Sequence, residues 1–69
     1  MLRRQTEFSV GQRIRKRSRG GGIWEIMGIH KDPSGAVHIE MFSMDDPNTR
    51  RTLSRFALSD PEQFELVSI

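Results

Sequence analysis

The sequence predicts an all-β protein, a small barrel of four to five antiparallel strands with a short helical turn before the last strand. Three observations lead to this fold class. From Phe8 onward, apolar and β-branched residues occur in short runs typical of strands. Tight-turn sequences separate the runs, the clearest being residues 32–35, Asp-Pro-Ser-Gly. The chain has only 69 residues, and closing the sheet removes exposed strand edges that so short a chain could not otherwise cover.

The first expected strand spans residues 12–18. Its residues alternate in character with the two-residue period of a strand. One face carries arginines at positions 13, 15 and 17, and the opposite face carries Ile14. The strand is therefore expected to present a row of positive charge on one side and part of the core on the other.

The second expected strand, residues 23–30, follows a flexible glycine loop. Gly20, Gly21 and Gly22 can adopt positive φ angles at little steric cost, which suits a hairpin or an open loop. The strand is rich in β-branched and aromatic residues, and we expect it to be the central one. Gly28 lies within it and is typical of a bulge that changes the direction of a strand.

The third strand is expected at residues 36–42, after a type I turn at residues 32–35. Asp at the first turn position, Pro at the second and Gly at the fourth are the residues that this turn prefers. Alternation along the strand places three apolar side chains on the expected core face, namely Val37, Ile39 and Met41. A second turn at residues 45–48 leads into a short fourth strand at residues 49–53.

The end of the chain predicts two helical turns and a last strand. Residues 54–58 suit a single helical turn, whose Phe56 and Leu58 are expected to close one end of the core. Residues 60–63 begin with Asp-Pro and resemble the start of a helix, so one more turn is expected there. The last strand is expected at residues 64–67.

The expected domain organisation is a flexible N-terminal arm, residues 1–7, followed by a single β-barrel domain, residues 8–69. The chain contains no cysteine, so no disulfide contributes to its stability. No apolar run approaches the roughly 18 residues of a membrane span, and the first residues lack the apolar segment of a signal peptide. We therefore expect a cytoplasmic protein that does not bind membranes.

The charges are unevenly distributed along the chain. Residues 1–34 carry a formal charge of +5 and residues 35–69 carry −3, which together give the net charge of +2. This polarity predicts one of two arrangements. Either a basic face binds an anionic partner, or oppositely charged faces attract each other in a homo-oligomer such as a homodimer.

A glycine, a basic strand, a glycine loop, an apolar strand, a hairpin and a late helical turn follow one another in this chain. This order resembles that of an SH3-like barrel of the KOW or Tudor type. The resemblance spans most of the chain and implies an SH3-like fold for the expected barrel. The residues that carry it are Gly11, Ile14, Gly20 to Gly22, Trp24, Ile26, Gly28, Ile29, Leu58 and residues 64–67.

A second, narrower resemblance concerns the basic strand. Residues 11–18, followed shortly by Trp24, are similar to the first strand and loop of plasmid-type dihydrofolate reductases, whose SH3-like barrels form a tetramer around one active pore. That family uses a Val-Gln-Ile-Tyr segment in a later strand. The corresponding residues 51–54 read Arg-Thr-Leu-Ser, and the chain contains no tyrosine. The resemblance therefore extends to the fold and not to the activity, and we expect no enzymatic function.

The basic run of the first strand and glycine loop is the candidate functional site. Side chains two residues apart on a strand stand about 6.6 Å apart, so a row of three arginines spans roughly 13 Å. Phosphates of a nucleic acid backbone would neutralise such a row. The sequence predicts a nucleic-acid-binding surface, for DNA or RNA, with Arg3 and Arg4 as auxiliary contacts. Its expected residues are Arg13, Arg15, Lys16, Arg17, Arg19 and Trp24.

Two alternatives to this interpretation are open at the level of sequence. The arginines could pair with Glu25 and Glu40 on neighbouring strands, or they could bind an acidic protein surface. Trp24 could stack on an unpaired base from a partly exposed position, or it could be the largest residue of the core.

The remaining polar residues predict no catalytic or metal site and no cofactor. His30 and His38 flank the Asp-Pro-Ser-Gly hairpin and are expected to be ordinary polar strand residues, because only Asp32 and Glu40 could complete a metal site near them. Asp45 and the following aspartate precede a proline and an asparagine, which favours turn formation over acid-base catalysis.

Overall fold

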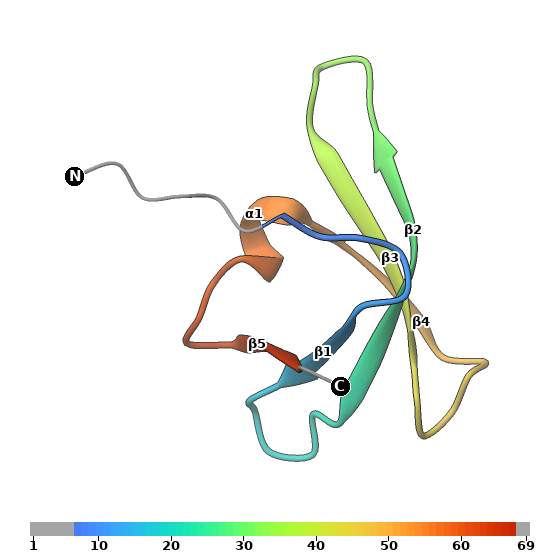
Figure 1. Cartoon of the computed structure of the whole chain (residues 1–69), viewed down its shortest axis with the longest axis vertical. Helices are drawn as coiled ribbons and strands as arrows, with labels where there is room; N and C mark the ends of the chain where they lie inside the picture. The colour runs from blue at the N-terminus through green and yellow to red at the C-terminus, as the bar shows by residue number, and fades with distance from the viewer. Residues whose placement is uncertain (1–6, 68–69) are drawn as a thin grey trace.

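A computed structural model describes residues 7–67 and has five antiparallel strands curled into a half-barrel (Figure 1). Within this range the sheet order is β4-β3-β2-β1-β5, so strands from the two ends of the chain lie side by side. The all-β prediction is confirmed, including one short helix before the last strand. The elements are β1 (Arg13–Lys16), β2 (Ile23–Lys31), β3 (Val37–Ser43), β4 (Arg50–Ser54), α1 (Arg55–Leu58) and β5 (Phe64–Val67).

β1 is shorter than the expected strand at residues 12–18, because the glycine loop begins earlier than predicted. The amide of Lys16 donates to the carbonyl of Gly22 at 3.0 Å, and the amide of Gly21 donates to the carbonyl of Ser18 at 2.9 Å. Gly20 and Gly22 have φ angles of +70° and +65°, in the left-handed region that glycine adopts without strain. The chain therefore reverses direction at residues 17–22 and returns as β2.

The β2–β3 hairpin forms as the sequence predicts. The amide of Gly35 donates to the carbonyl of Asp32 at 2.9 Å and closes the turn. The pairing register shifts between Ile26 and Gly28, which places a bulge at Met27 and confirms that the strand is irregular beside this glycine. β3 begins and ends one residue later than expected, and β4 covers 50–54 rather than 49–53.

The core lies on the inner face of the curled sheet, where the short helix covers it. Leu58 of α1 is buried, whereas Phe56, which we expected to close the core beside it, is 88% exposed. Residues two positions apart on a helix do not face the same side, so only one of the two can reach the core. The buried apolar residues are Ile14, Trp24, Ile26, Ile39, Met41 and Leu58.

The short helix is held in place at its first residue. Ser54 ends β4 with extended backbone angles, and its hydroxyl oxygen accepts a hydrogen bond from the amide of Ala57 at 3.0 Å. Serine is a preferred N-cap because its side chain satisfies an amide that has no partner within the helix. Residues 60–63 form a single turn before β5, as expected, with the amide of Phe64 donating to the carbonyl of Asp60 at 3.0 Å.

Two predictions concern features that the described residues test only in part or not at all. The expected arm at residues 1–7 lies outside the described range except for Glu7, and so do Arg3 and Arg4. Among residues 7–67, no helix is long and apolar enough to cross a membrane.

Candidate nucleic-acid interface

The sheet divides the basic run between its two faces. Arg13 lies opposite Glu25 in the β1–β2 register and Ile14 lies opposite Trp24. Directly opposed residues share a face of the sheet, and neighbours along a strand lie on opposite faces. Arg13 and Arg15 therefore lie on the outer face, whereas Lys16 lies on the inner face with the core residues.

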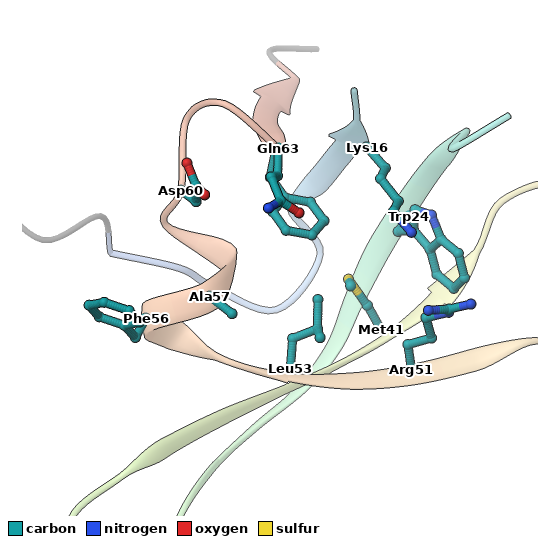
Figure 2. Close-up of a pocket in the computed structure, with 10 residues that line it drawn as sticks. Lys16, Trp24, Met41, Arg51, Leu53, Phe56, Ala57, Asp60 and Gln63 are labelled. Carbon is teal, nitrogen blue, oxygen red and sulfur yellow. The ribbon is translucent and has the colours of Figure 1, made fainter. Parts of the chain in front are cut away.

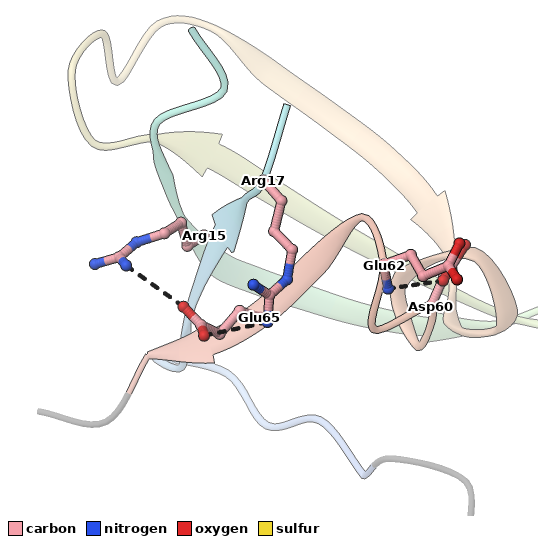
Figure 3. A network of polar contacts seen from close by, with 5 residues as sticks. All are labelled: Arg15, Arg17, Asp60, Glu62 and Glu65. Atoms are coloured by element: carbon pink, nitrogen blue, oxygen red, sulfur yellow. Dashed lines mark hydrogen bonds and ion pairs between the residues drawn. The ribbon is translucent and has the colours of Figure 1, made fainter. Parts of the chain in front are cut away.

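On the outer face, acidic side chains stand beside the arginines. The Nε of Arg13 lies 3.5 Å from a carboxylate oxygen of Glu25. A single carboxylate, that of Glu65 in β5, lies 3.4 Å from Nη1 of Arg15 and 3.2 Å from Nη2 of Arg17 (Figure 3). These side chains are all partly exposed, so each pair contributes roughly 0.2–1 kcal/mol. Two acids thus offset part of the positive charge of three arginines.

Of the two acids that the alternative interpretation paired with the arginines, one lies beside an arginine. Glu25 does pair with Arg13, but Glu40 does not pair with an arginine of residues 7–67. Glu40 lies on β3, which β2 separates from β1, and its carboxylate lies 3.6 Å from Nε2 of His30 instead. Glu65 was missed because its strand is far from β1 in sequence. The available signal was its alternation with Phe64 and Leu66, which places a polar residue on the outer face of the last strand.

The inner face opens into a groove of about 370 Å³ between the two edges of the half-barrel. Apolar side chains of Met41 and Leu53 contribute to its lining, as does Gln63. Phe56 of α1 lies at its border, and Figure 2 shows its ring pointing away from the groove. Lys16 from β1 and Arg51 from β4 both line the side of the groove that Trp24 forms. The groove therefore combines an apolar lining with two cations on this side and one acid, Asp60, on the side of α1.

Trp24 belongs to the core and also forms part of the groove. Its side chain is buried, with the residue only 7% exposed, and its indole Nε1 donates a hydrogen bond to the carbonyl of Gly21 at 2.8 Å. The guanidinium carbon of Arg51 lies 5.8 Å from the centre of the indole ring, within the range of a cation–π interaction. Of the two alternatives for Trp24, the structure shows the core position. An incoming base could not stack on its covered face without displacing Arg51.

Several cations at one end of the molecule have no acidic partner among residues 7–67. Figure 1 shows the glycine loop and the β3–β4 connection at the same end, and the amide of Met44 donates to the carbonyl of Ile23 between them at 2.9 Å. The β3–β4 connection also carries two acids, of which Asp46 accepts hydrogen bonds from Asn48 and Thr49, as expected of a turn residue. The cations without a described acidic partner at this end are Lys16, Arg19, Arg50 and Arg51.

A second polar cluster lies at the opposite end, on the β2–β3 hairpin. His30 and His38 are cross-strand partners, and Nε2 of His38 lies 2.9 Å from a carboxylate oxygen of Asp32. Hydrogen bonds from the side chains of Ser34 and then His38 hold the pKa of the Asp32 carboxyl well below its ordinary value. Within the described part of the chain, no three His, Asp or Glu side chains gather as a metal site would require. The cluster organises the hairpin.

Of the residues that line the groove, sequence reasoning assigned only Lys16 and Trp24 to the site. Arg51 and Phe56, among those it missed, lie in a segment interpreted only as a strand and a core-closing turn, and the approach of Arg51 to Lys16 depends on how far the sheet curls. The comparisons with protein-family models, with curated proteins and with solved structures each give no match to this chain. The fold and the groove together define the class of this protein as a small β half-barrel with a partly apolar groove that carries two cations.

Proposed function

We propose that the protein is a non-enzymatic, cytoplasmic module that binds nucleic acid through the basic groove and the glycine-loop end. One observation carries the proposal. Lys16 and Arg51 line the same side of one groove, beside Trp24, and neither forms an ion pair with an acid of residues 7–67. Like charges brought together repel each other, and an anion placed between them changes that repulsion into attraction. A phosphate group has the charge and the acceptor oxygens that both side chains need.

The surrounding charges extend this contact along a polymer. Arg19 in the glycine loop and Arg50 at the start of β4 are exposed, and Figure 1 shows these two segments at the same end of the molecule. Arg15 and Arg17 lie nearby and share Glu65 in weak surface pairs, so a phosphate can compete for their guanidinium groups. A run of phosphates suits such a surface better than a single small anion does. The element order also supports our proposal that the fold is an SH3-like barrel of the KOW or Tudor type.

The salt dependence of binding tests this proposal. With phosphate contacts from Lys16, Arg19, Arg50 and Arg51, the logarithm of the affinity should fall against the logarithm of salt concentration with a slope of about −4 on duplex DNA and about −3 on a single strand. Fluorescence anisotropy with labelled DNA and RNA at several salt concentrations measures the slope. The double variant Lys16→Gln/Arg51→Gln should bind more weakly and with a slope about 2 units shallower on duplex DNA.

The matched control is Lys31→Gln, which removes a cation at the end of β2 away from the glycine loop. It changes the net charge by one and should affect binding much less than either groove substitution. A wild-type protein that binds no nucleic acid at low salt would overturn the proposal. So would a double variant that binds as tightly as the wild type.

The two unpaired edges of the sheet favour a second candidate function, self-association. Within residues 7–67, β4 and β5 each pair with one neighbouring strand only, so each leaves one edge without a partner strand. The uneven distribution of charge would let such edges attract one another in a homodimer. Light scattering at low and high salt tests this candidate, because a charge-driven dimer should dissociate as salt increases. A monomer at every salt concentration would exclude it.

A further inference from the structure

Phe42 of β3 stands on the outer face of the sheet, opposite the core. Its neighbour Met41 is buried in the core, and side chains that follow one another along a strand point to opposite faces. Phe42 itself is only partly buried. Within residues 7–67, the partly buried apolar residues that pack against the core are others, namely Phe8, Val37, Leu53 and Phe64. A large aromatic side chain is therefore placed on a face that has no apolar interior.

Charged residues flank Phe42 in one row across the sheet. In the strand register, Phe42 lies opposite Arg50 of β4 on one side and opposite Glu25 of β2 on the other. Arg13 of β1 follows beyond Glu25 in the same row. Directly opposed residues share a face of the sheet, and neighbouring strands lie about 4.8 Å apart. The row therefore places an aromatic residue between two arginines whose backbone positions are roughly 14 Å apart.

The charges of this row suit a nucleotide chain. Arg50 is exposed and forms no ion pair with an acid of residues 7–67, so it can bind a phosphate. Glu25, the acid beside Phe42, lies 3.5 Å from the Nε of Arg13, which offsets part of its charge. A carboxylate also accepts hydrogen bonds from the exocyclic amino group of cytosine. The centre of the row thus favours a base, and its two ends favour phosphates.

We infer that the outer face binds single-stranded nucleic acid, with one unpaired base against the ring of Phe42 and phosphates at Arg50 and Arg13. This inference rests on the proposed function and specifies its ligand and a second contact surface. Stacking on an aromatic side chain requires a base whose face is free, and in a duplex the bases stack on one another. A duplex can therefore reach the arginines through its phosphates but gains nothing from Phe42.

Removal of the Phe42 ring separates the two modes of binding. Phe42→Leu keeps an apolar side chain but has no ring, so it should weaken binding of a labelled oligodeoxycytidine by about 5-fold or more. Binding of a labelled hairpin duplex should change by less than about 2-fold, because its contacts are with phosphates. The matched control is Phe42→Tyr, which keeps the ring and should bind both nucleic acids as the wild type does. Circular dichroism establishes that both variants remain folded.

A fluorescent base supplies a readout that the wild type alone can give. An oligodeoxycytidine that carries one aminopurine, whose emission is quenched by stacking, should lose emission when it binds. With Phe42→Leu at saturation, the loss should be smaller. Unchanged affinity of Phe42→Leu for oligodeoxycytidine, with equal emission in the two complexes, would overturn this inference and leave the proposed function intact. Failure of the wild type to bind either nucleic acid would overturn both.

Discussion

Glu65 determines how much positive charge the outer face presents. Its carboxylate lies beside the guanidinium groups of both Arg15 and Arg17, so one side chain offsets charge from two arginines. All three side chains are about half-exposed, and water and salt weaken such contacts. The arrangement lowers repulsion between the arginines in the free protein. It also leaves them able to exchange the carboxylate for a phosphate.

Replacing this carboxylate should strengthen nucleic-acid binding. In Glu65→Gln the two arginines lose their acidic partner, so the salt slope on duplex DNA should become steeper by up to about 2 units. Unfolding by urea should show a loss of stability below about 1 kcal/mol, because the pairs are exposed. The control is Glu62→Gln, which makes the same change in net charge at an exposed acid without an ion pair among residues 7–67. Equal slopes for the two variants would show that the arginines do not reach phosphate.

At the scale of elements, the β2–β3 hairpin depends on one carboxylate. Oδ1 of Asp32 accepts hydrogen bonds from the amides of Ser34 and Ala36 and from the Ser34 hydroxyl, while Oδ2 contacts His38. These interactions favour the charged form and lower the pKa of Asp32 in the folded state. A carboxyl whose pKa is lowered by folding stabilises the fold at pH values above its ordinary pKa. That stabilisation is lost as the pH falls through the folded-state pKa.

The hairpin should therefore make the protein sensitive to acid. Below about pH 4, near the ordinary pKa of an aspartate, wild-type stability should fall steadily with pH. Asp32→Asn should be less stable at neutral pH and should lose less on acidification, because asparagine keeps an acceptor oxygen but does not titrate. Ser34→Ala, which removes the hydroxyl donor alone, should lie between the two. Thermal unfolding followed by circular dichroism from pH 2 to pH 7 measures the three profiles, and parallel profiles would contradict this account.

The elements themselves were predictable because their signals are local. The Asp-Pro-Ser-Gly turn, the alternation of Val37, Ile39 and Met41, and the glycine beside the bulge each act over a few residues. The orientation of Phe56 also depends on a local signal. The prediction that Phe56 and Leu58 both close the core was wrong, because residues two positions apart on a helical turn point to different sides.

At the scale of the whole molecule, fewer features can be predicted from the sequence, because the contacts that form the candidate site join segments far apart in the chain. The pairing of β1 with β5 brings Glu65 to Arg15 across 50 residues. The curl of the sheet brings Arg51 over Trp24 and turns Lys16 into the groove. Hydrophobic alternation specifies which face of a strand is buried, but not which strand becomes its neighbour. The alternation therefore divided the basic strand correctly between two faces, but it could not show which residues of other strands lie beside each face.

The pairing of β1 with β5 also has a consequence for how the chain folds. Closing a long loop costs more entropy than closing a hairpin, so contacts between nearby residues form earlier than those between chain ends. The β2–β3 hairpin is local, whereas β5 pairs with β1 across about 50 residues, so we expect β5 to join β1 after the hairpin has formed. In native-state hydrogen exchange, the amides that link β1 to β5 should therefore open at lower free energy than those between Ile26 and Met41. Because Phe64 of β5 lines the groove, these openings would separate one of its walls from the rest. A ligand bound in the groove should therefore slow hydrogen exchange more at the amides of β5 than at those of the other strands.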